Sequence, residues 1–176
     1  MPDRRRRLLN AAGLALLARP LAALAKSSDV SETPLPGLRR WGRGEFRRFG
    51  FLVYEASLWA GDDPTRPPLA LRLDYRRRIA GSAIAEASVK EMRRFGSEET
   101  VLAAWHERMA RIFPDVQDGD HILGVYTPDG ARFSHNGRDL GGIDDARFAR
   151  DFFGIWLDPR TSAPELRAAL LAPPAG

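Results

Sequence analysis

The chain has 176 residues, of which 44% are hydrophobic and 28% charged, a composition typical of one soluble globular domain with a short extension. It has no cysteine, which excludes disulfides, thiolate metal sites and cysteine nucleophiles. Five of the 27 basic residues but only one of the 23 acidic residues lie in the first 25 positions. The net charge of +4 therefore belongs to the N-terminal segment, and no nucleic-acid partner is expected.

Residues 1–25 have the order of a secretory signal peptide. A positive stretch (Arg4 to Arg7) precedes an apolar stretch (Leu8 to Leu17), and small residues at the end of the segment predict cleavage after Ala25. We expect a periplasmic protein exported by the Sec or the twin-arginine route. Arg19 interrupts the apolar character, which leaves an attached amphipathic helix as the alternative. No run of about 20 apolar residues exists, so the mature form is expected to have no membrane span.

Residues 26–39 begin with a polar, proline-containing stretch and are expected to form a flexible arm before a folded domain at 40–172. The segment Phe46–Trp59 is aromatic and β-branched on both faces, which predicts one central strand. The segment Leu69–Tyr75 alternates apolar and polar residues. Such a strand has one buried face and one face that is wet or lines a pocket, which favours an antiparallel sheet.

Two helices are expected next. The first covers Ile79–Phe95 and ends at Gly96, because glycine adopts the left-handed conformation that terminates helices. The second covers Glu99–Phe113, with Ser97 as its expected N-cap. Apolar residues recur at helical spacing along this second segment, so one face is expected to be buried.

The following segment predicts a β-meander. A strand at His121–Thr127 and a return strand at Ala131–His135 are separated by a turn signal, and Asn136-Gly137 is a second hairpin signal. With a two-residue turn of Asp129-Gly130, His121 and His135 would point to opposite faces of the sheet, whereas a three-residue loop would bring them together. We predict no metal site and no cofactor.

Two more helices are expected at the C-terminal end. Asp144 or Asp145 is the predicted cap of a helix from Ala146 to about Phe153–Leu157, on which Phe152 and Trp156 should be buried on one face. The residues Ser162-Ala163-Pro164-Glu165 have the form of a capping box at the start of a last helix. Strands and helices joined by hairpins, without βαβ crossovers, predict an α+β fold.

Several short motifs occur in a fixed order along the domain: Phe51–Trp59 (FLVYEASLW), Tyr126–Gly130 (YTPDG), Asn136-Gly137 and Phe153–Leu157 (FGIWL). Together they resemble the bacterial chalcone isomerase-like family over roughly residues 40–171. The resemblance implies a large antiparallel sheet with helices layered on one face, an open-faced sandwich. This agrees with the α+β fold read from the residues themselves.

The resemblance also allows the isomerase chemistry to be examined. In the plant enzymes of the family, an arginine, a threonine on the first long strand, and a tyrosine and an asparagine from the helical region stabilise the developing oxyanion. Here Phe49 stands at the threonine position, and no tyrosine or asparagine occurs between Arg76 and Tyr126. The arginine is not assigned among Arg39, Arg40, Arg43, Arg47 and Arg48. No catalytic residue is therefore predicted.

The aromatic side chains have two interpretations: an ordinary core, or a pocket between sheet and helices for an apolar small molecule. In the second case an arginine at the rim would pair with a carboxylate. The predicted ligand-binding residues are Arg47, Tyr54, Arg72 and Trp156. We therefore expect a non-catalytic exported domain that binds a small hydrophobic or acidic ligand. The alternatives are an isomerase of altered substrate and a structural protein of the cell envelope without a ligand.

Overall fold

The computed structural model describes residues 35–173, so the predicted leader and most of the predicted arm lie outside the described residues. Within this part of the chain, no helix is long and apolar enough to cross a membrane. The elements, in chain order, are β1 (Arg39–Arg48), β2 (Phe51–Ala60), β3 (Leu69–Tyr75), α1 (Gly81–Met92), the short 3₁₀ helix η1 (Arg93–Phe95), α2 (Glu99–Ile112), β4 (His121–Thr127), β5 (Gly130–His135), β6 (Arg138–Ile143), α3 (Ala146–Leu157) and α4 (Pro164–Leu170).

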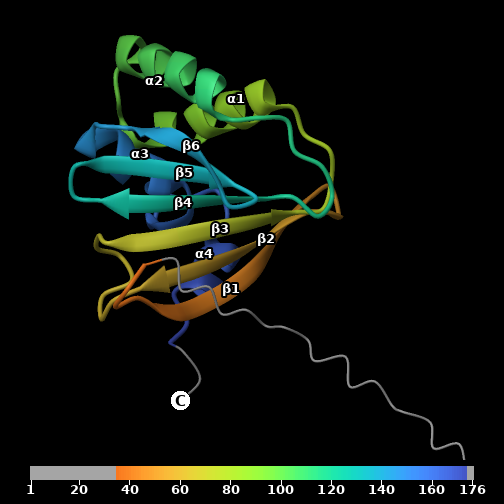
Figure 1. Ribbon diagram of the computed structural model, residues 1–176, viewed down its shortest axis with the longest axis vertical. Coiled ribbons are helices and arrows are strands. Elements are labelled where there is room, and N and C mark those ends of the chain that lie inside the picture. Colours follow the sequence, from red (N-terminus) through yellow and green to blue (C-terminus); the bar gives the residue numbers. More distant parts are fainter. Residues whose placement is uncertain (1–34, 174–176) are drawn as a thin grey trace, which may run out of the picture. The chain divides into compact units, whose positions relative to one another are not determined.

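The described strands form one antiparallel sheet of six strands in the order β1-β2-β3-β4-β5-β6 (Figure 1). Sequence neighbours are therefore also neighbours in space, and the only long excursion within the sheet is the α1–α2 segment between β3 and β4. This arrangement confirms the predicted α+β fold and the β-meander at its C-terminal half.

One face of the sheet carries the core. In β3 the side chains of Leu69, Leu71 and Tyr75 are buried, whereas Arg72 and Asp74 alternate with them on the other face and are only partly buried. Helix α3 packs on β4 and β5, α4 packs on β1 and β2, and α1 packs on α2 and α3. The period-two pattern of β3 thus separates a helix-covered face from a face with charged side chains, as predicted.

Two glycines in β1 allow α4 to approach the sheet. A Cβ atom at Gly42 would lie 2.1 Å from the carbonyl oxygen of Ala169, and one at Gly44 would lie 2.8 Å from Cδ1 of Leu166. Both distances are too short for a side chain, so α4 can rest on β1 only because these positions lack one.

Helix α3 supplies the largest aromatic contribution to the core. Asp145 is its N-cap, because the carboxylate accepts hydrogen bonds from the backbone N–H groups of Arg147 and Phe148. Phe152 and Trp156 are each only 6% exposed, and their ring centroids lie 5.5 Å apart. The prediction that these two side chains share a buried helical face is confirmed.

The predicted single strand at Phe46–Trp59 is wrong. The chain reverses at Phe49 and Gly50, which have φ angles of 51° and 80°, and Arg48 pairs with Phe51 across a two-residue turn. The sequence gives no clear turn signal here, because Gly50 lies between two phenylalanines and a phenylalanine at positive φ is uncommon.

Two predicted caps are also corrected. The N-cap position of α2 is Glu98, and the Ser97 hydroxyl instead donates a 2.6 Å hydrogen bond to the buried carboxylate of Asp151. At the start of α4 the hydroxyl of Thr161, not Ser162, accepts a hydrogen bond from the N–H of Ala163. Ser97 thus bonds a residue that is distant in sequence, and Thr161 is better placed than Ser162 to accept the bond from Ala163. Residue spacing along the chain reveals neither arrangement.

The turn between β4 and β5 consists of Pro128 and Asp129, one residue earlier than assumed, since Thr127 pairs with Gly130. His135 consequently pairs with Ile122, so strand alternation directs His121 and His135 to opposite faces of the sheet. The histidines do not form a pair, as expected for a two-residue turn.

We predict that Phe148→Ala destabilises the domain by about 3–5 kcal/mol, because Phe148 is fully buried and its removal leaves a cavity among other rings. The matched control is Phe51→Ala, a ring that is 61% exposed, which should change the free energy of unfolding by less than about 0.5 kcal/mol. Denaturant titration of both variants measures the difference. Equal effects would contradict the assigned core.

Candidate ligand-binding pocket

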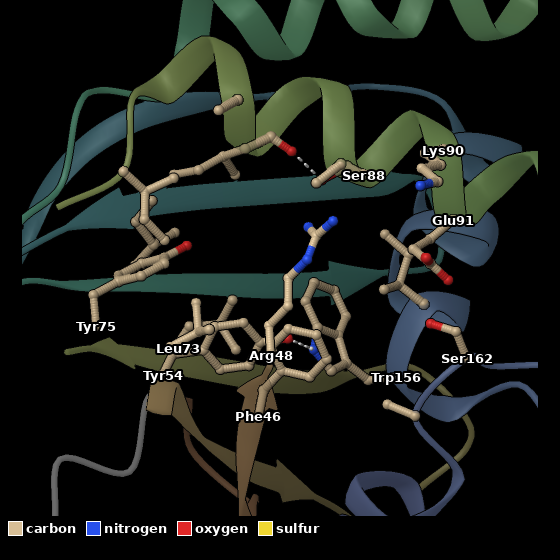
Figure 2. Close-up of a pocket in the computed structure, with 18 of the residues that line it drawn as sticks. Phe46, Arg48, Tyr54, Leu73, Tyr75, Ser88, Lys90, Glu91, Trp156 and Ser162 are labelled. Carbon is tan, nitrogen blue, oxygen red and sulfur yellow. Dashed lines mark hydrogen bonds between the residues drawn. The ribbon is translucent and has the colours of Figure 1, made fainter. Parts of the chain in front are cut away.

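A cavity of about 580 Å³ lies between the sheet and helices α1 and α3 (Figure 2), a size typical of small-molecule sites. Its lining is mostly apolar. The sheet contributes Phe46, Val53, Tyr54, Leu73, Tyr75 and Ile122; the helices contribute Ile84, Ala87, Ser88, Glu91, Phe152, Ile155 and Trp156. The β1–β2 hairpin adds Arg47, Arg48 and Phe49.

Secondary structure explains why these side chains meet. In α1, the residues Ile84, Ala87, Ser88 and Glu91 follow the i, i+3, i+4, i+7 spacing of one helical face, so a single stripe of α1 borders the cavity. In β2, Tyr54 shares the core face with Ala56 and Leu58, and it faces its cross-strand partner Phe46 in β1.

Tyr54 is the centre of the pocket's aromatic wall. Its ring stacks on Phe46 at a centroid distance of 5.0 Å and meets the edge of Tyr75 at 6.0 Å. The indole N–H of Trp156 donates a 3.0 Å hydrogen bond to the Tyr54 hydroxyl (Figure 2). This bond joins α3 to β2, and because the Tyr54 oxygen is the acceptor, its O–H remains able to donate a hydrogen bond.

The pocket's cations differ in their partners. Strand alternation places Arg47 beside Glu45, with which it forms an ion pair at 2.7 Å. Among the described residues, by contrast, no carboxylate pairs with Arg48 or with Lys90 of α1. Figure 2 shows the side chain of Arg48, an exposed residue, extending from the hairpin toward α1 into the space between the labelled lining residues.

Glu91 of α1 makes its part of the pocket lining unfavourable for an anion. Its side chain is only 22% exposed, and its Oε2 atom lies 3.1 Å from Nε of Arg94 without a hydrogen bond of good geometry. The negative charge of Glu91 also acts on Tyr54, whose pKa is raised mainly by burial and further by this charge. A carboxylate ligand would therefore be repelled from Glu91 and attracted to Arg48.

The structure brings three of the four predicted ligand-binding residues to the pocket: Arg47, Tyr54 and Trp156. Arg72 does not line it. Its position in β3 is opposite in parity to Leu73 and Tyr75, so it lies on the other face of the sheet, where it pairs with Asp74 at 2.7 Å. Arg76, which follows β3, also lies outside the lining and pairs with Glu55 at 2.9 Å.

Sequence reasoning named Arg48 only as one of five candidate arginines and did not find Lys90 or Glu91. Arg48 could be assigned only once the turn at Phe49-Gly50 was known. This turn places Arg48 at the end of β1, two residues beyond Phe46. Nothing in the α1 segment by itself indicates which of its faces borders a cavity.

A sheet of this topology with helices on one face and a cavity between the two layers defines a class of small α+β pocket domains. The model of the chalcone isomerase-like family matches residues 42–172, so the chain belongs to that family.

Two relatives place this membership in context. The chain is 28% identical over 151 residues to an uncharacterized protein of Haemophilus influenzae, which covers 84% of this chain and 75% of that protein. Among solved structures, the fold is similar to the fatty-acid binding protein of Arabidopsis thaliana, with a TM-score of 0.58 and 13% identity over 78% of this chain and 88% of the other. At this identity the similarity establishes the shared fold alone.

We predict that the buried phenols make stability fall at high pH. Burial raises the pKa of Tyr54 and Tyr75 above the ordinary value of about 10. The unfolded chain therefore loses these protons first, and the stability they contribute is complete below pH ~10 and is lost as the pH rises above it.

Urea titrations between pH ~9 and ~11 measure this loss, which should be smaller in Tyr54→Phe/Tyr75→Phe than in the parent chain. Tyr126→Phe is the comparison: burial raises the pKa of Tyr126 too, but this side chain is less buried, so its removal should reduce the pH slope less than the double variant does. An identical pH slope in the double variant and the parent would contradict the assigned burial.

Proposed function

We propose that the pocket reversibly binds a fatty acid or a similar amphipathic carboxylate, without converting it chemically. The observation that carries this proposal is Arg48, an exposed cation without a carboxylate partner among the described residues, which lies at the mouth of a mostly apolar cavity. The fatty-acid binding protein with the same fold supports the same ligand class.

In the proposed complex, the carboxylate pairs with Arg48 and the hydrocarbon chain lies along Leu73, Ile84 and Phe152. A guanidinium–carboxylate pair at the edge of an apolar cavity is a charge-assisted interaction that fixes the ligand's orientation. Lys90 adds positive charge at the rim, whereas Glu91 disfavours the reversed orientation. Tyr54 and Tyr75 offer hydroxyl groups beside the ligand.

The isomerase is not proposed. Phe49, which stands at the position of the family's threonine, lies in the hairpin turn and supplies no hydroxyl. The Tyr54 oxygen already accepts a hydrogen bond from Trp156, and the pKa of this phenol is raised, so it stays a neutral donor. The cavity itself argues against the alternative of a structural protein without a ligand, since a filled interior would be expected there.

We further propose that the protein acts in the periplasm after removal of residues 1–25, on the basis of the basic, apolar and small-residue segments at the N-terminus. A hydrophobic carboxylate in an aqueous compartment needs a carrier that shields its chain, so export and carrier function are mutually consistent.

We predict that Arg48→Met lowers the affinity for palmitate about 10–100-fold, because one charge-assisted contact is lost, and leaves the affinity for the corresponding alcohol, palmityl alcohol, unchanged. Arg72→Met is the matched control, since the same substitution on the other face of the sheet should change neither affinity. Calorimetric titration measures both ligands.

After incubation with the protein, mass spectrometry should recover palmitate unaltered. Equal losses in the Arg48 and Arg72 variants, or equal affinities of the parent chain for acid and alcohol, would contradict the assigned carboxylate site. A chemically changed ligand would contradict the carrier function.

We also predict that protein recovered from the periplasm begins at Lys26, because Ala23 and Ala25 are small enough for a signal peptidase. N-terminal sequencing of the periplasmic fraction measures this, and replacement of Ala25 by a bulky residue should cause the precursor to accumulate. A periplasmic chain that still begins at residue 1 or 2 would contradict cleavage.

A further inference from the structure

The tip of the β1–β2 hairpin exposes two large rings to solvent. Phe49 is 85% exposed and Phe51 is 61% exposed, although the other large aromatic side chains of the described chain are buried or partly buried. A contiguous pair of exposed rings has no role in the core and marks a surface that contacts something apolar.

The backbone at the tip adds to this anomaly. Phe49-Gly50 has φ angles of 51° and 80°, nearly the same as the 50° and 80° of Asn136-Gly137 in the β5–β6 hairpin. Asparagine suits such a turn, and Asn136 uses its side chain to bind Asp120 and the N–H of His121. Phe49 gains neither a favourable conformation nor a buried contact in the domain, so its presence points to a contact outside the domain.

The rings are surrounded by arginines. The guanidinium of Arg48 lies 5.4 Å from the centroid of Phe49, and that of Arg77 lies 5.0 Å from the centroid of Phe51. Arg78 borders the same shallow depression as both rings. Within residues 35–173, no carboxylate pairs with any of these three arginines.

Two acidic residues of the β1–β2 hairpin are already engaged. Glu45 forms an ion pair with Arg47, and Glu55 forms one with Arg76. The tip is therefore a pair of exposed rings within a locally positive surface, although residues 26–176 as a whole contain equal numbers of basic and acidic residues.

We propose that this tip, formed by Phe49 and Phe51 with Arg48, Arg77 and Arg78, docks on the surface of an anionic lipid bilayer. The rings enter the region between headgroups and acyl chains, and Arg77 and Arg78 pair with lipid phosphates, whereas Arg48 lies between the tip and the pocket. Charge complementarity selects this partner, since a purely apolar protein surface would leave the desolvated guanidinium groups of Arg77 and Arg78 without counter-charges.

The docking site is continuous with the mouth of the pocket, because Arg48 and Phe49 also line the large cavity. A domain docked by its tip would hold the pocket mouth against the bilayer, where an amphipathic carboxylate enters or leaves. This consequence rests on the proposed function, but docking itself does not require a ligand in the pocket.

Cosedimentation of the full chain with vesicles tests the proposal in the absence of any fatty acid. Binding is expected to vesicles of phosphatidylethanolamine and phosphatidylglycerol, to weaken with added salt, and to be much lower on phosphatidylcholine alone. The double variant Phe49→Asn/Phe51→Thr should bind at least about tenfold more weakly, since two rings no longer enter the interface.

These two substitutions keep the hairpin intact, because asparagine suits the positive φ of position 49 and threonine suits a strand. The melting temperature should therefore not fall. Arg77→Gln/Arg78→Gln should weaken binding by about fivefold per arginine. The matched control is Arg40→Gln/Arg111→Gln, two exposed arginines that lie outside the tip, which should leave vesicle binding unchanged.

Because the chain lacks cysteine, a single introduced cysteine can report the site of contact independently of the N-terminal segment, which all variants share. An environment-sensitive fluorophore on Arg47→Cys should shift to shorter wavelength on anionic vesicles. The same label on Arg40→Cys, at the other end of β1, should not.

Three results would overturn the proposal: unchanged vesicle binding by Phe49→Asn/Phe51→Thr, equal binding of the parent chain to neutral and anionic vesicles, or equal fluorophore shifts at both positions. Concentration-dependent dimerisation that disappears in the same double variant, without vesicle binding, would assign the tip to a second copy of the chain instead. If the parent chain binds vesicles but does not bind palmitate, the carrier function is disproved and the docking site stands.

Discussion

The packing of α3 across the middle of the sheet is the contact on which the core and the pocket both depend. Its capping by Asp145 fixes where the helix begins, and from there Phe148 and Phe152 reach the core while Trp156 reaches Tyr54 on β2. Because α3 packs on β4 and β5, whereas α4 packs on β1 and β2, the helical layer is continuous on one side of the sheet. The pocket lies where α1 completes this layer with an apolar stripe that does not fill the space above Tyr54.

This geometry separates two kinds of polar group. The buried polar residues Ser97 and Asp151 serve the fold and are hydrogen-bonded to each other. Two cations at the pocket, Arg48 at the end of the hairpin and Lys90 on α1, in contrast pair with no carboxylate among the described residues. A fold that leaves cations at the rim of an apolar cavity is suited to an anionic amphiphile, which satisfies the charge and the apolar walls together.

The β1–β2 hairpin connects the pocket to the outside. Its bulge between Phe46 and Arg47 and its tight turn aim Arg48 at the cavity and the two rings at solvent. The same short segment therefore supplies a polar contact inside the pocket and an apolar contact outside it. In a carrier of lipid-like molecules, such a segment would couple the place of docking to the place of ligand transfer.

The sequence alone determined the elements whose signals lie in neighbouring residues. These are the alternating strand β3, the Asn136-Gly137 turn, and the Asp145-capped helix with Phe152 and Trp156 on one face. Together they determined the α+β class. The sequence also predicted Tyr54 and Trp156 as neighbours of a possible ligand. It could not distinguish Arg48 from Arg72, because that choice depends on the face to which each strand position points after the chain reverses at Phe49-Gly50. Tertiary structure alone decided it, since a pocket is a space between elements distant in sequence, whereas a pattern describes residues that are close along the chain.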